Sequence, residues 1–138
     1  MPFRSHFKIA LAMLVTACFA GAPANAASSS EKLMGIAASC AAFYLTAFDK
    51  LDIPIEGNEA KRQFYYDSAD AIGRNKLYMK DRAIQTYFNE HVIGRTVLLD
   101  VALEQNPDVA GPKIKQNLTA CDGFMERLSA ESGLPLPQ

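Results

Sequence analysis

Two cysteines, Cys40 and Cys121, place the strongest constraint on how this chain can fold. Each lies on the apolar stripe of a segment with helical periodicity. The third cysteine, Cys18, falls in an N-terminal segment that we expect to be removed. An even number of cysteines in an oxidising compartment is typical of a disulfide, and export disfavours the alternative of two buried free thiols. We therefore predict a Cys40–Cys121 bond.

The expectation of an oxidising compartment comes from residues 1–26. Arg4 and Lys8 precede an uncharged apolar run, 9–22, and small residues then end in Ala24-Asn25-Ala26. This order is that of a secretory signal peptide cleaved after Ala26. The run is also shorter than the roughly 20 apolar residues that a membrane-spanning helix needs. We expect a periplasmic or secreted protein whose mature chain has no transmembrane segment.

A second type of export signal overlaps the first. Val15-Thr16-Ala17-Cys18 resembles the lipobox of bacterial lipoproteins. If that site is used, Cys18 becomes a lipidated N-terminus and anchors the protein to a membrane. We prefer cleavage after Ala26, because the Ala-Asn-Ala site lies downstream of a Gly-Ala-Pro stretch that breaks the apolar run.

The mature chain, 27–138, has the length of a single domain. Between its proline- and glycine-rich stretches, apolar residues recur every three or four positions, which predicts helices and no strands. We expect four helices and a disordered tail, 133–138. The helices run from near Ser30 to before Pro54, from Asn58 to about Gly73, from a turn ending near Asp81 to about Gln105, and through Ile114 to Gly133.

The cysteine positions predict how these helices are arranged. Cys40 follows Ser30 by ten residues, and Cys121 precedes Glu131 by ten. In an up-down-up-down bundle, the first and last helices are antiparallel neighbours. If the two cysteines face each other, the start of the first helix lies level with the end of the last helix. The sequence therefore predicts an all-α, four-helix up-down-up-down bundle with one disulfide joining helices 1 and 4.

Several kinds of chemistry are missing from the mature sequence. It contains no CxxC or CxxCH pair, no HExxH motif, and no Glu-x-x-His pairs for a di-iron site. It also lacks a glycine-rich phosphate loop. Twelve basic and 15 acidic residues give the mature chain a net charge of −3, which argues against a nucleic-acid partner. We expect no cofactor, no metal site and no catalytic residue.

Three side chains have a catalytic interpretation that we weigh against a structural one. Asp67 and Asp70 lie three residues apart on one helix side, where paired carboxylates could cleave glycosides. The simpler interpretation is a solvated acidic face. His91, the one histidine of the mature chain, could act as a base, but a histidine packed at a helix interface is the simpler reading.

The turn between the second and third helices is rich in basic side chains. Acidic residues dominate the opposite end, so the bundle should be electrically polar along its axis. An ordinary hydrated turn is the alternative interpretation. We predict a partner-binding tip there, formed by Arg74, Lys76, Tyr78, Lys80 and Arg82.

These patterns indicate an exported, non-catalytic small helical protein that binds a protein or an envelope ligand, such as an inhibitor, immunity factor, chaperone or adaptor. The alternative is a small carboxylate-based periplasmic hydrolase acting on cell-wall glycan. A cleft holding a carboxylate of raised pKa would separate the two. The sequence leaves open the identity of the partner and whether the chain forms a homo-oligomer.

Overall fold

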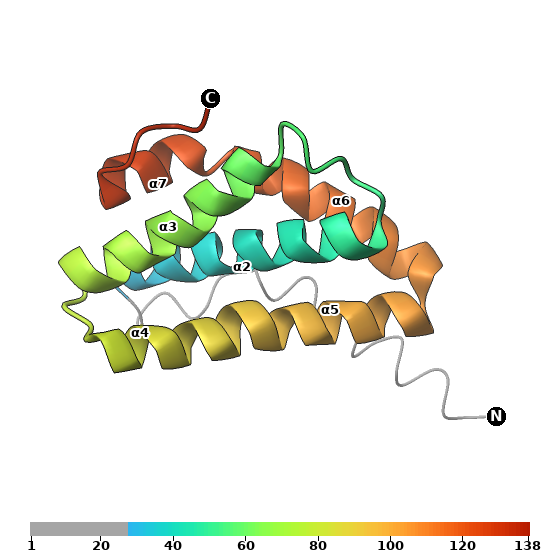
Figure 1. The fold of residues 1–138 in the computed structure, drawn as a ribbon, viewed down its shortest axis with the longest axis horizontal. Coiled ribbons are helices and arrows are strands. Elements are labelled where there is room, and N and C mark those ends of the chain that lie inside the picture. The colour runs from blue at the N-terminus through green and yellow to red at the C-terminus, as the bar shows by residue number, and fades with distance from the viewer. Residues whose placement is uncertain (1–27) are drawn as a thin grey trace.

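The computed structural model describes residues 28–138, and all regular structure in this range is helical (Figure 1). The predicted signal peptide 1–26 and the alternative lipidation site Cys18 lie outside the described residues. In the part described, no helix is long and apolar enough to cross a membrane. The elements are α2 (Ser29–Lys50), α3 (Glu59–Asn75), α4 (Asp81–Phe88), the π-helical segment η1 (Asn89–Ile93), α5 (Gly94–Gln105), α6 (Pro107–Asp122) and α7 (Met125–Ser132).

Helix α2 begins with a capping box that the sequence predicted only in part. The Ser28 hydroxyl accepts from the Glu31 backbone N–H at 3.2 Å, and the Glu31 carboxylate accepts from the Ser28 backbone N–H at 3.1 Å. Two backbone donors that the helix itself cannot satisfy are thereby paired. The helix starts where the serines and Glu31 indicated, and it ends at Lys50, before Pro54.

The middle of α2 is the centre of the core. Every residue from Ala37 to Tyr44 is buried, so this stretch is covered on all sides. Its neighbours are α3, η1, α5, α6 and α7, and in Figure 1 the helix runs between α3 and α5. Four alanines among these eight residues leave room for the surrounding helices to approach closely. The apolar stripe predicted from the sequence is therefore wider than one helix face.

The predicted disulfide is present and joins α2 to α6. The Cα atoms of Cys40 and Cys121 lie 5.7 Å apart, and both residues are fully buried. The all-α class and this bond are confirmed.

The four-helix bundle is not confirmed, because the described residues form more than four helices. The last predicted helix is interrupted at Gly123 and Phe124, and α7 then packs against α3. Glycine loses the most conformational freedom in a helix, so Gly123 is a natural break. Helix α2 also contacts α3, α5 and α6, whereas a square bundle leaves diagonal helices apart.

The predicted helix end at Gly133 is correct, since α7 stops there and this glycine adopts a φ of 76°.

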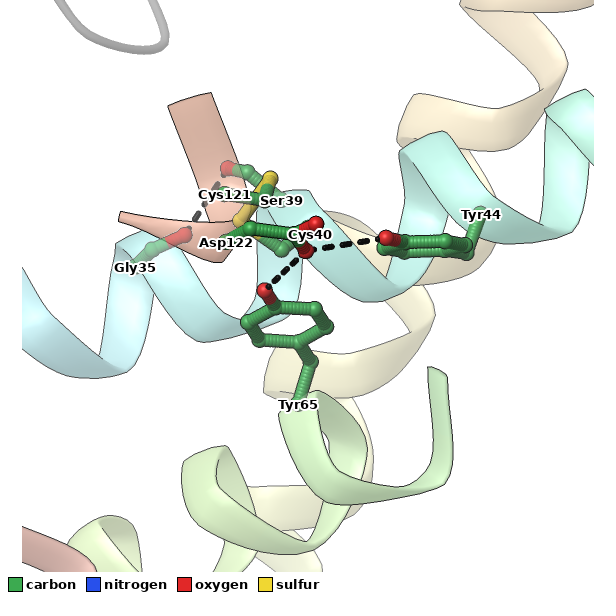
Figure 2. The surroundings of a disulfide bond; sticks show 7 residues. All are labelled: Gly35, Ser39, Cys40, Tyr44, Tyr65, Cys121 and Asp122. Atoms are coloured by element: carbon green, nitrogen blue, oxygen red, sulfur yellow. Dashed lines mark hydrogen bonds between the residues drawn. A yellow bond between two sulfur atoms is a disulfide. The ribbon is translucent and has the colours of Figure 1, made fainter. Parts of the chain in front are cut away.

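A polar cluster, which we call the Asp122 hub, lies beside the disulfide (Figure 2). The hydroxyls of Tyr44 and Tyr65 donate to Asp122 Oδ1 at 3.0 and 3.2 Å. Lys61 Nζ lies 2.9 Å from Asp122 Oδ2. Burial, followed by the negative charge of Asp122, raises the pKa of both tyrosines. The hub thus ties α2, α3 and α6 together next to the covalent bond.

The disulfide should carry a large share of the stability. It closes a loop of 81 residues, which corresponds to about 4–5 kcal/mol in the chain-entropy model. Reduction of the purified protein should therefore lower Tm by about 15–25 °C. Thermal unfolding followed by circular dichroism, with and without reductant, measures this shift. An unchanged Tm in fully reduced protein, with both thiols verified by alkylation, would contradict the assignment.

The Asp122 hub predicts a loss of stability at alkaline pH. An unfolded tyrosine ionises near pH 10, whereas the folded pKa of Tyr44 and Tyr65 is higher, so the folded state holds these protons more tightly. Their contribution is complete below pH 10 and is lost as the pH rises above it, by about 1.4 kcal/mol per pH unit for each tyrosine.

Urea unfolding between pH 9 and 12 should show this slope. The Tyr44→Phe/Tyr65→Phe variant should lose most of it, while Tyr78→Phe, at an exposed position, keeps it. Equal slopes in all three proteins would show that the two hub tyrosines do not titrate as described.

Candidate functional site

The predicted partner-binding residues gather at the turn between α3 and α4. Two hydrogen bonds hold this turn: Leu77 N–H donates to Ile72 O at 3.1 Å, and Met79 N–H donates to Gly73 O at 2.9 Å. They satisfy carbonyls at the end of α3 and turn the Leu77 and Met79 side chains toward the core. The residues between and beside them are exposed, and with Arg82 they form what we call the tip: Lys76, Tyr78, Lys80 and Arg82.

Tyr78 stands at the apex of the tip in an unusual conformation. Its side chain is 83% exposed, and its φ is 54°, in the left-handed region. A bulky residue rarely adopts this region, and the strain is of the order of 1–3 kcal/mol. The backbone hydrogen bonds of Leu77 and Met79 hold this conformation, while the Tyr78 side chain itself contributes neither burial nor a hydrogen bond within the described residues. The molecule therefore displays an aromatic ring to solvent at a cost in stability.

The basic residues predicted to bind a partner fall into two groups. Arg74 Nε lies 2.9 Å from an Asp70 oxygen, and Arg74 also binds Asp81, so this guanidinium is neutralised within the molecule. Lys76, Lys80 and Arg82 form no ion pair with any residue in the range 28–138. The structure therefore separates Arg74 from the other basic residues, which supply the uncompensated positive charge of the tip.

A hollow of about 290 Å³ opens beside the tip, where α3 and α4 diverge. We call it the α3–α4 groove. The rings of Tyr66 and Phe88 stack at 4.4 Å, one from each side. Phe88 and Ile84 are buried, so the groove has an apolar floor between polar walls. Its lining comprises Tyr66, Asp70 and Arg74 from α3, Asp81, Ile84, Gln85 and Phe88 from α4, and Asn89 of η1.

The α3–α4 groove was not predicted from the sequence, although one pattern in the sequence indicates it. Ile84, Gln85, Phe88 and Asn89 follow the spacing of a single helix side, which places two apolar and two amide side chains together. The adjoining η1 segment is a π-helix, a feature common at functional sites. The spacing alone does not predict that α3 forms the opposite wall of the groove.

The residues considered for catalysis do not form a constellation. Asp67 is exposed and accepts from Gln63 Nε2 at 2.8 Å, while Asp70 is bound by Arg74. His91 packs against Tyr87, with 4.1 Å between the ring centroids. Burial, then the positive charge of Arg95, lowers the pKa of His91, so its imidazole is neutral near pH 7. This is the packed histidine that the simpler interpretation predicted.

Comparison with known proteins adds nothing to this description. No family model, curated protein or solved structure matches the chain. Among the described residues, no group of three histidine, cysteine or carboxylate side chains could hold a metal ion.

The strain at Tyr78 can be measured directly. Tyr78→Gly and Tyr78→Ala both remove the exposed ring, but only glycine adopts a positive φ without a steric penalty. We expect Tyr78→Gly to unfold at a free energy about 1 kcal/mol higher than Tyr78→Ala. Urea denaturation of both variants tests this difference. A Tyr78→Ala protein as stable as Tyr78→Gly would show that the turn is not strained.

Proposed function

We propose that this chain is an exported, non-catalytic helical protein that binds an acidic protein partner in the periplasm or outside the cell. The observation that carries the proposal is the exposed Tyr78, held at a positive φ between Lys76 and Lys80, neither of which forms an ion pair within residues 28–138. A strained, exposed aromatic residue costs stability, so its presence is best explained by a contact made outside the chain.

The composition of the tip suits a protein partner. Tyrosine and arginine are frequent among the residues that dominate binding energy, because each joins an apolar body to a polar end. The uncompensated charges of Lys76, Lys80 and Arg82 would accelerate association with an acidic surface and orient it.

Export is part of the proposal. The Cys40–Cys121 bond is of the kind that persists in oxidising compartments, and it is fully buried, as a structural disulfide should be. The sequence of residues 1–26 supports the same compartment. Lipidation at Cys18 is the alternative form of export and would hold the same tip near a membrane.

The alternative of a carboxylate-based hydrolase has less support. Glycoside cleavage needs one carboxylic acid that retains its proton and a second, ionised carboxylate. Asp70 is bound by a guanidinium, and Asp67 lies outside the α3–α4 groove, bound to an amide. Burial raises the pKa of the Asp100 carboxyl on α5, but Asp100 does not line the α3–α4 groove, so that groove does not hold the raised-pKa carboxylate that a hydrolase needs.

Differential capture from an envelope extract tests the proposal. The bait is the oxidised protein, and the test variant is Lys76→Glu/Lys80→Glu. We expect the reversals to reduce capture of the specific partner at least tenfold, which corresponds to about 1.4 kcal/mol. Tyr78→Gly should reduce it similarly without loss of stability.

The matched control is Lys113→Glu/Lys115→Glu on α6, which makes the same change in net charge away from the tip. It should capture the partner as the parent protein does. A partner retained equally by the tip and control variants would refute binding through the tip. Hydrolysis of cell-wall glycan that is abolished by Asp67→Asn would refute the non-catalytic assignment.

A further inference from the structure

We propose that the α3–α4 groove is a binding site for one ring of a neutral sugar. This site is separate from the tip, and its ligand is a small molecule, so the inference goes beyond the proposed protein partner. Four properties of the groove carry it: its size, the balance of its charges, its mixture of hydrogen-bond donors and acceptors, and its apolar floor.

The size of the groove restricts the ligand to a small one. Its volume of about 290 Å³ is at the lower end of the range for ligand pockets, which is roughly 300–1,000 Å³. The lining residues surround a single hollow bounded by α3 on one side and by α4 with Asn89 on the other. One ring fits such a compartment, whereas an extended peptide of several residues needs a longer channel.

The charges in the groove disfavour a charged ligand. Asp70 and Asp81 both bind Arg74, one from each helix. Two carboxylates and one guanidinium give the groove a net charge of −1, so an anionic ligand is repelled. A cationic ligand would have to share both carboxylates with Arg74, which already pairs with them. A neutral ligand leaves both ion pairs intact.

The remaining polar groups match hydroxyl groups. The side-chain amides of Gln85 and Asn89 make no hydrogen bond within the described residues, and each offers both a donor and an acceptor. The carboxylates of Asp70 and Asp81 keep free lone pairs after binding Arg74. A sugar hydroxyl donates one hydrogen bond and accepts others, so a ring with several hydroxyls can satisfy both kinds of partner at once.

The floor supplies the apolar contact that a sugar ring also needs. Tyr66 is half-buried against Phe88, and Ile84 is buried beside them. Because the Tyr66 and Phe88 rings are stacked on each other, a sugar ring would contact the floor through their exposed edges while its hydroxyl groups meet the walls. A site with polar walls and a narrow apolar floor is poorly suited to a lipid chain, which would leave the wall groups without partners.

A nuclear magnetic resonance titration tests the inference. The oxidised, ¹⁵N-labelled protein is titrated with glucose and N-acetylglucosamine, and separately with glucose 6-phosphate and a blocked neutral trialanine peptide. We expect saturable shifts for at least one neutral sugar, centred on the amides of Tyr66, Ile84, Gln85, Phe88 and Asn89, with a Kd of about 1 mM. Glucose 6-phosphate should bind several-fold more weakly than glucose.

The test variant is Gln85→Ala/Asn89→Ala, which removes two exposed amides from the walls and should weaken sugar binding at least tenfold. The matched control, Gln105→Ala/Gln116→Ala, removes two exposed amides elsewhere and should bind as the parent protein does. Absence of saturable shifts with both neutral sugars, tighter binding of the peptide in the groove, or unchanged affinity in the wall variant would overturn the inference. The wall variant should still capture the protein partner through the tip. Loss of sugar binding can therefore be distinguished from failure of the proposed protein-binding function.

Discussion

The covalent bond between Cys40 and Cys121 is the constraint on which the rest of the structure depends. It fixes the middle of α2 against the C-terminal part of α6, and it is surrounded by the most deeply buried stretch of the chain. Asp122, the next residue after Cys121, is thereby brought within reach of Tyr44 and Tyr65 (Figure 2). Lys61 also reaches it. One bond between two helices therefore also determines where a third helix, α3, attaches.

The position of α3 in turn produces the two surface features that we interpret as functional. Near the disulfide, α3 is held to α2 and α6 through the Asp122 hub and is covered by α7. At its other end α3 is joined to α4 by the Arg74–Asp81 ion pair and the Tyr66–Phe88 stack, and the α3–α4 groove lies beside these two contacts. The turn that joins the two helices carries Tyr78 and the exposed cations outward. The end of α3 near the disulfide thus anchors the helix in the fold, and the opposite end forms the surface that we interpret as functional.

Helix ends and turns that depend on neighbouring residues, together with the pairing of the two cysteines, could be predicted from the sequence. The start of α2 at the serines, its end before Pro54, the turn between Gly73 and Asp81, and the helix end at Gly133 are each determined by a few neighbouring residues. The disulfide follows from cysteine count and compartment. These features need no knowledge of distant contacts, and the structure contains all of them.

Features that depend on distant contacts could not be predicted. The break at Gly123 is accompanied by the packing of α7 on α3, and nothing near Gly123 in the sequence specifies that packing. Arg74 belonged to the predicted binding set, but Asp81 reaches it from the next helix. The groove needs Tyr66 and Phe88 to face each other from two helices. The basic residues predicted to bind a partner do lie at the turn between α3 and α4, but their ion pairs and the neighbouring hollow depend on tertiary structure.

Peptide mapping of the purified, unreduced protein by mass spectrometry tests the central claim most directly. The account predicts a proteolytic fragment in which the peptides containing Cys40 and Cys121 are linked, with a mass two hydrogen atoms below their sum and no free thiol at either residue. Recovery of both peptides as free thiols, or a link from either cysteine to another partner, would contradict the described architecture and the placement of α3 that follows from it.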